Sequence, residues 1–99
     1  MTTRIGDIGE HYAASWFLEK GLEVFMNASG CGKADMILWS GDKMMPVDIK
    51  TLRSPYTRKD GSYSLSQTPR FTDNGIAIVV YVLGEDAVRL PEGFWEHFE

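Results

Sequence analysis

The chain has 99 residues, of which 43% are hydrophobic, and its formal net charge is −4. This length supports one small core, so we expect a single domain over residues 1–99, and the three Trp, four Tyr and five Phe exclude a disordered chain. The one cysteine, Cys31, excludes an intrachain disulfide framework. No run approaches the roughly 20 apolar residues of a membrane span, and the N-terminus has no apolar signal-peptide region. We therefore expect a cytoplasmic protein with no membrane partner.

The first predicted element is a helix over residues 8–20. Asp7 would be its N-cap, Glu10 would complete a capping box with it, and Gly21 occupies the place of a C-terminal glycine. The apolar stripe of this helix includes Glu10 beside residues such as Phe17. A carboxylate in such a stripe indicates a partner for Glu10, although the capping box is a purely structural alternative.

Strand-like segments follow the helix, each bounded by turn residues. They cover residues 22–26, 35–39, 44–51, 76–83 and 87–90. The short turn between the second and third segments predicts an antiparallel hairpin. The segment 76–83 is a continuous apolar run, which is typical of a strand covered on both faces.

The stretch from residue 54 to residue 75 is predicted to be a loop, because it contains two prolines and two glycines and shows no helical periodicity. A short strand over residues 63–66 and a helical turn over residues 91–99, with its aromatic side chains packed on the body, complete the predicted elements. The expected fold class is α/β: an N-terminal helix packed on a mixed sheet of four to five strands.

Basic residues concentrate in one part of this acidic chain. Half of the Lys and Arg residues lie between residues 50 and 75, namely Lys50, Arg53, Arg58, Lys59 and Arg70. A local basic patch fits contacts with nucleic-acid phosphates. Arg53, Arg58, Lys59 and Arg70 are therefore the candidate nucleic-acid contacts, and a solvated basic loop is the alternative.

Four ionisable residues carry the functional hypothesis: Glu10, Asp35, Asp48 and Lys50. Side chains two residues apart in a strand share a face, so Asp48 and Lys50 point the same way. Asp35 opens the neighbouring strand of the hairpin, so its carboxylate can converge with that of Asp48. Two or three acids are enough to hold Mg²⁺, which assists phosphodiester hydrolysis, and the backbone carbonyl of Ile49 is a further candidate ligand. Lys50 would orient water or stabilise charge on phosphorus.

The order of these motifs resembles the PD-(D/E)xK nuclease superfamily, and within it the small Holliday-junction-resolvase-like endonucleases. The likeness covers about residues 4 to 53 and lies in Gly6-x-x-Gly9-Glu10, Gly32-x-Ala34-Asp35 and Val47-Asp48-Ile49-Lys50. It implies a restriction-endonuclease-like core and DNA cleavage that depends on Mg²⁺ or Mn²⁺, with no small-molecule cofactor. By position it implies Glu10, Asp35 and Asp48 as metal ligands and Lys50 as the catalytic lysine. Gln67 lies where some members carry a polar residue near the metal.

The sequence departs from the family pattern in two places. Ala34 replaces the proline that often precedes the first strand acid, and residues 54–75 lack the helix that usually follows the lysine-bearing strand. Each strand acid also has a structural alternative: Asp48 could belong to a solvated strand face, and Asp35 could cap the preceding glycine turn.

Two classes of function follow. The first is an endonuclease for branched or structured DNA, which would act as a homodimer if it cuts both strands, because one small chain carries one site. The second is a catalytically inactive module of the same fold that binds nucleic acid or another protein. The chemistry of the site is also compatible with RNA as substrate.

Overall fold

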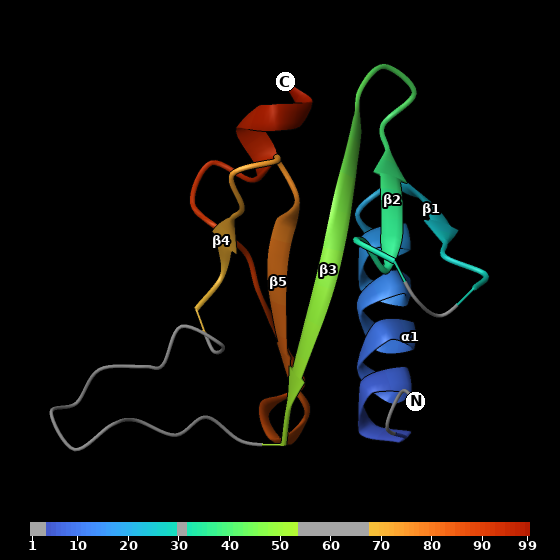
Figure 1. Cartoon of the computed structure of the whole chain (residues 1–99), viewed down its shortest axis with the longest axis vertical. Helices are drawn as coiled ribbons and strands as arrows, with labels where there is room; N and C mark the ends of the chain where they lie inside the picture. The colour runs from blue at the N-terminus through green and yellow to red at the C-terminus, as the bar shows by residue number, and fades with distance from the viewer. Residues whose placement is uncertain (1–3, 30–31, 54–67) are drawn as a thin grey trace, which may run out of the picture.

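The computed structural model describes residues 4–29, 32–53 and 68–99. Within them one N-terminal helix, α1 (Arg4–Glu19), packs on a six-stranded mixed sheet (Figure 1). The strands are β1 (Glu23–Met26), β2 (Met36–Trp39), β3 (Met44–Leu52), β4 (Arg70–Phe71), β5 (Ala77–Val82) and β6 (Ala87–Arg89), with two 3₁₀ turns, η2 (Leu83–Glu85) and η3 (Trp95–Phe98). The α/β class and the mixed sheet are confirmed. No helix in the described ranges is long and apolar enough to cross a membrane.

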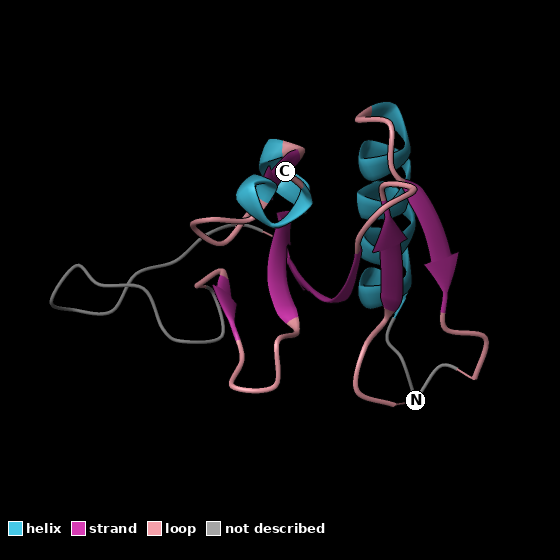
Figure 2. Ribbon diagram, turned by 90° about the horizontal axis from the view of Figure 1, so that it is seen from above, coloured by secondary structure: helices cyan, strands magenta, loops and turns pink. Residues whose placement is uncertain are grey.

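The sheet is organised around β3. Strands β1, β2 and β3 form an antiparallel meander, which confirms the predicted hairpin, and β3 pairs in parallel with β5. Strands β4 and β6 both pair antiparallel with β5, opposite its beginning and its end respectively. Seen from above (Figure 2), the β1–β2 end of the sheet lies beside α1, whereas β4 and β5 lie at the other end.

The prediction of four to five strands was therefore too low, because β4 falls in a stretch predicted to be loop. This strand has only two residues, Arg70 and Phe71, which is too short for an alternating sequence pattern. The two residues form a strand because they pair with β5. The strand predicted over residues 63–66 lies outside the described residues.

Helix α1 begins one turn earlier than predicted, so the capping box was wrong: Asp7 lies inside the helix, in its first turn. An acid anywhere in the first turn stabilises a helix N-terminus through the helix dipole, so Asp7 does not have to be the N-cap. Further along α1, a Cβ placed on Gly9 would be only 1.8 Å from Oγ1 of Thr51 in β3, which shows how closely this turn of the helix approaches the sheet.

The predicted C-terminal glycine of the helix is confirmed. Gly21 has a φ of 91°, in the left-handed region, and its N–H donates to the carbonyl of Leu18 at 3.0 Å. The N–H of Leu22 donates to the carbonyl of Phe17 at 3.2 Å. These two bonds form a Schellman motif that turns the chain into β1.

The core lies between α1 and one face of the sheet. Its buried side chains are Ala13, Phe17, Leu22, Met36, Leu38, Met45, Val47, Ile49, Ala77, Val79, Tyr81 and Phe94. All of β5 is buried, as the apolar run predicted. The predicted packing of the C-terminal aromatic residues is also confirmed, because Phe94 stacks on Phe17 with ring centroids 5.7 Å apart and Trp95 contacts Trp16.

Candidate functional site

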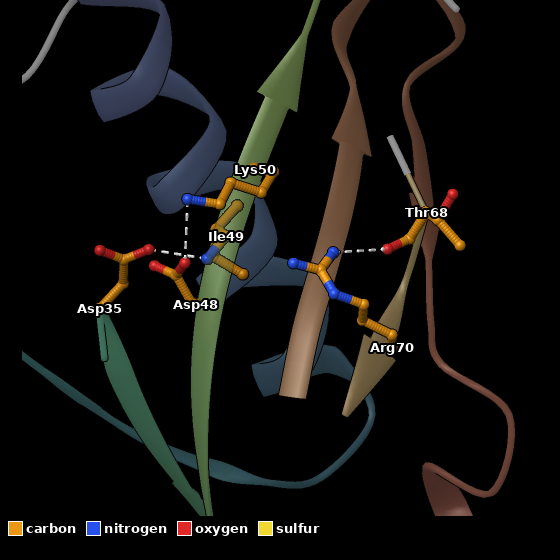
Figure 3. A network of polar contacts seen from close by, with 6 residues as sticks. All are labelled: Asp35, Asp48, Ile49, Lys50, Thr68 and Arg70. Atoms are coloured by element: carbon orange, nitrogen blue, oxygen red, sulfur yellow. Dashed lines mark hydrogen bonds and ion pairs between the residues drawn. The ribbon is translucent and has the colours of Figure 1, made fainter. Parts of the chain in front are cut away.

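The candidate site lies where β2 begins beside the middle of β3, on the sheet face opposite α1. We call this face the outer face. Residues of β3 such as Val47 and Ile49 point into the core under α1, so the alternate residues Asp48 and Lys50 belong to the outer face, as predicted. Asp35, immediately before β2, points toward both of them (Figure 3).

The ladder between β2 and β3 is irregular at Asp35. Met36 is the residue opposite Val47, yet the N–H of Asp35 also turns to Val47 and donates to its carbonyl at 2.9 Å. Two consecutive residues facing one residue of the partner strand is the pattern of a β-bulge, which re-aims a side chain. The Asp35 carboxylate accordingly lies against β3, where its Oδ2 accepts a hydrogen bond from the N–H of Ile49 at 2.6 Å.

Asp48 and Lys50 form an ion pair across one step of β3. The Nζ of Lys50 is 3.1 Å from Oδ2 of Asp48, and the side chains of the lysine and the acid are 48% and 24% exposed respectively. The lysine is thus held at Asp48 while about half of its side chain remains exposed. A partly exposed pair of this kind adds little to stability, so its geometry does not by itself indicate a structural role.

The acids form one cluster of negative charge. The pKa of Asp35 is raised from 3.8 to about 7, first by burial, then by a hydrogen bond with the Asp48 carboxyl, and further by the charges of Asp48 and Glu10. The N–H of Ile49 acts in the opposite direction and lowers the pKa. At neutral pH this cluster therefore favours uptake of a proton or another cation.

Glu10 lies on α1 and acts on Asp35 through its negative charge. It is half-buried at the margin of the apolar stripe, and with Asp35 it lines a cavity of about 280 Å³. Asp7, His11, Met26, Asn27 and Ala28 complete the lining. Of the four residues predicted to converge, Glu10 and Asp35 line this cavity, whereas Asp48 and Lys50 do not.

The carboxylate oxygens of the site are of the ligand type that a hard divalent cation prefers. Mg²⁺ needs only one or two carboxylates because it keeps several of its waters, and the neighbouring Asp35 and Asp48 provide two. The N–H of Ile49 points to Asp35, and in a strand the carbonyl of the same residue points to the same side. Among the described residues, no three His, Cys, Asp or Glu side chains form a ready metal cage.

The predicted nucleic-acid contacts are only partly described. Arg70 of β4 pairs with Ile78, which in turn pairs with Asp48, so Arg70 lies in the same cross-strand row as the acids. Figure 3 shows its guanidinium on the site's side of β4, with Nη1 donating to the carbonyl of Thr68 at 3.2 Å. Arg53 is exposed just after β3. The other two predicted contacts, Arg58 and Lys59, lie outside the described residues, and so does Gln67, the predicted polar residue near the metal.

One basic residue near the site was not singled out in the sequence. Arg89 of β6 pairs with Val80, which pairs with Lys50, so Arg89 lies one row along the outer face from Arg70. Its guanidinium also forms an ion pair with Glu85 at 3.3 Å. No local signal identifies Arg89, because its place depends on β6 pairing with β5 and on β5 pairing with β3.

Known proteins give no direct guide to this site. No family model, curated protein or solved structure matches the chain. Its chemistry rests on its own residues.

Proposed function

We propose that the chain is a divalent-metal-dependent DNA endonuclease with the restriction-endonuclease-like core of the PD-(D/E)xK superfamily. The observation that carries the proposal is the grouping of Asp35, Asp48 and Lys50: the Asp35 carboxylate lies against β3 beside Asp48, which raises the pKa of Asp35, and the Lys50 amine is 3.1 Å from Asp48. Two neighbouring acids are unfavourable at neutral pH unless they share a proton or a cation. A helix followed by strands that carry the acids further supports this core.

Asp35 and Asp48 would hold Mg²⁺ or Mn²⁺, with Glu10 and the carbonyl of Ile49 as further oxygen donors. A bound ion would polarise a phosphoryl oxygen and lower the pKa of an attacking water. Lys50 is held at Asp48 with about half of its side chain exposed, so it is placed to stabilise negative charge that develops on the phosphate.

The outer face also offers a path for the DNA backbone. Arg70 lies two strands from Asp48 in the same row, which corresponds to about 10 Å. Arg53 would contribute beyond the end of β3, together with Arg58 and Lys59. Preference for branched DNA and action as a homodimer are parts of the proposal that the family resemblance suggests.

The test is cleavage of labelled linear, nicked, flap and four-way DNA with Mg²⁺, Mn²⁺ or EDTA. Cleavage is expected only with a divalent ion, and Asp48→Asn and Lys50→Met should each lower its rate about 10²- to 10³-fold. Asp42→Asn is the matched control, because Asp42 lies in the β2–β3 turn, up to about 20 Å along the chain from Asp48. Cleavage in EDTA, or full activity of the Asp48 and Lys50 variants, would refute the proposal. Metal-independent binding without cleavage would favour the inactive module.

A further inference from the structure

The outer face carries large apolar side chains on the meander β1–β2–β3. Cross-strand pairing sets Trp39 opposite Met44, and Ile37 opposite both Phe25 and Pro46. All five point away from α1, because the alternate residues of these strands form the core. We call this set the apolar face: Phe25, Ile37, Trp39, Met44 and Pro46.

The apolar face is partly open to solvent. Phe25 is 53% and Met44 60% exposed, Ile37, Trp39 and Pro46 are half-buried, and none of the five belongs to the core cluster. An antiparallel sheet with one face on the core normally presents polar residues on the other. A contiguous exposed apolar patch marks an interaction site.

The patch has the form of a stacking surface. The rings of Phe25 and Trp39 have centroids 6.4 Å apart and are inclined at 46°, so they do not cover each other face to face. Beside them a cavity of about 280 Å³ is lined by Phe25, Ile37 and the polar Asn27, together with Met26, Ala34 and Met36. A hollow with apolar walls and few polar groups suits a flat, mostly apolar ligand with polar edges.

The apolar face continues directly into the candidate site. Along β3 the outer-face residues run Met44, Pro46, Asp48 and Lys50, and each step of two residues advances about 7 Å. The acidic row therefore separates the aromatic side chains from the basic row that holds Lys50. Arg89 lies in the basic row with Lys50, whereas Arg70 lies in the acidic row, two strands from Asp48. Phosphates are attracted to the basic side of the acids, and uncharged rings can contact the aromatic side chains on the other side.

We propose that the apolar face stacks unpaired bases of a nucleic-acid strand whose backbone passes the Asp35–Asp48–Lys50 site. This inference rests on the proposed function and names its substrate class: a nucleic acid with an unpaired stretch beside the scissile phosphodiester. Bases inside a duplex are already stacked on each other, whereas unpaired bases stack on aromatic side chains regardless of sequence. A second copy of the chain fits less well, since a stable interface uses about 20–30 residues a side and this patch has five.

Binding affinity measured with a protein that cannot cleave its substrate reports on base stacking independently of catalysis. All proteins carry Asp48→Asn, and fluorescence anisotropy with Mg²⁺ compares three labelled probes: a single-stranded oligonucleotide, the same oligonucleotide with abasic sites, and its duplex. Trp39→Leu and Phe25→Leu keep the apolar character but remove the rings. Phe71→Leu is the matched control, because Phe71 is 40% exposed but pairs with the core residue Ala77, and so lies on the other face of the sheet.

Each aromatic substitution should weaken single-strand binding about 5- to 150-fold, whereas Phe71→Leu should change it less than about twofold. Abasic sites should weaken binding to the parent protein and have no further effect on the Trp39 variant, and duplex binding should not change. Equal affinities for both oligonucleotides, or conversion of a dimer to a monomer by Trp39→Leu in sedimentation, would overturn the inference. Ring-dependent binding in a protein that never cleaves DNA would support stacking while refuting the proposed catalysis.

Discussion

Replacing Asp35 by Asn is expected to stabilise the protein at neutral pH and to remove the proposed activity. The Asn side chain retains an oxygen that can accept the N–H of Ile49, and its amide can donate to the Asp48 carboxylate. The substitution removes only the negative charge, which burial and the two neighbouring acids make unfavourable. Asp35→Asn therefore isolates the electrostatic cost of the cluster.

The sign and size of the expected change in unfolding free energy follow from the pKa of Asp35, which is raised from 3.8 to about 7. Between these values the folded protein binds the proton and the unfolded chain does not, so stability falls as pH rises and levels off above about 7. At 1.36 kcal/mol per pH unit the loss has a ceiling of about 4 kcal/mol, and screening of the half-exposed carboxylate reduces it to about 2 kcal/mol. For a domain of this size, that corresponds to about 8–16 °C in Tm.

Thermal and urea unfolding at pH 4 and pH 8, without divalent ions, measure this difference. Asp35→Asn should match the wild-type protein near pH 4 and exceed it by about 2 kcal/mol at pH 8. Added Mg²⁺ should stabilise the wild-type protein more than the variant, because the ion binds the charged site. Asp42→Asn, in the exposed turn, retains Asp35 and should therefore have the same stability as the wild-type protein at both pH values. A variant less stable than wild type at pH 8, or a difference that is the same at both pH values, would refute the reasoning.

Three further predictions concern β3 and its contact with α1. Gly9→Ala should destabilise the fold by about 1–3 kcal/mol, because its Cβ would lie 1.8 Å from Oγ1 of Thr51. Helix propensity alone predicts that the same substitution stabilises the fold by about 1 kcal/mol. Urea unfolding distinguishes the two effects: lower stability indicates the steric clash, and higher stability indicates helix propensity. Thr51→Val should stabilise the fold by about 1 kcal/mol, because Oγ1 of Thr51 is buried without a hydrogen-bond partner among the described residues. Lower stability of this variant in urea unfolding would contradict the prediction. Lys50→Met should lose no more than about 1 kcal/mol of stability while lowering the cleavage rate about 10²- to 10³-fold, and a larger loss of stability on melting would indicate a structural role.

Features that depend on neighbouring residues could be predicted from the sequence. The alternation that puts Asp48 and Lys50 on one face is a property of any strand, and the glycine at residue 21 sets the end of α1 locally. The hairpin before Asp48 follows from the short turn between two strand-like segments. Local patterns are therefore enough to place Asp48 and Lys50 together on one face of β3.

Features that depend on distant parts of the chain could not be predicted. The close approach of α1 to β3 at Gly9 depends on Thr51, more than forty positions away, and no residue beside Gly9 indicates it. The bulge that turns Asp35 toward β3 arises from pairing with Val47. The place of Arg89 depends on two strand pairings in succession, one of them parallel.

The hydrogen bond from the Ile49 N–H to the Asp35 carboxylate gives the site a spectroscopic signal of its own. Most amides of β3 face backbone carbonyls, whose charge does not change with pH, whereas this one faces a group that titrates at about 7. Its ¹⁵N and ¹H chemical shifts should therefore follow the protonation of Asp35, and should respond again when a cation displaces the proton. A single backbone resonance thus records the charge state of the cluster in solution, without a substrate and without a label on any acid.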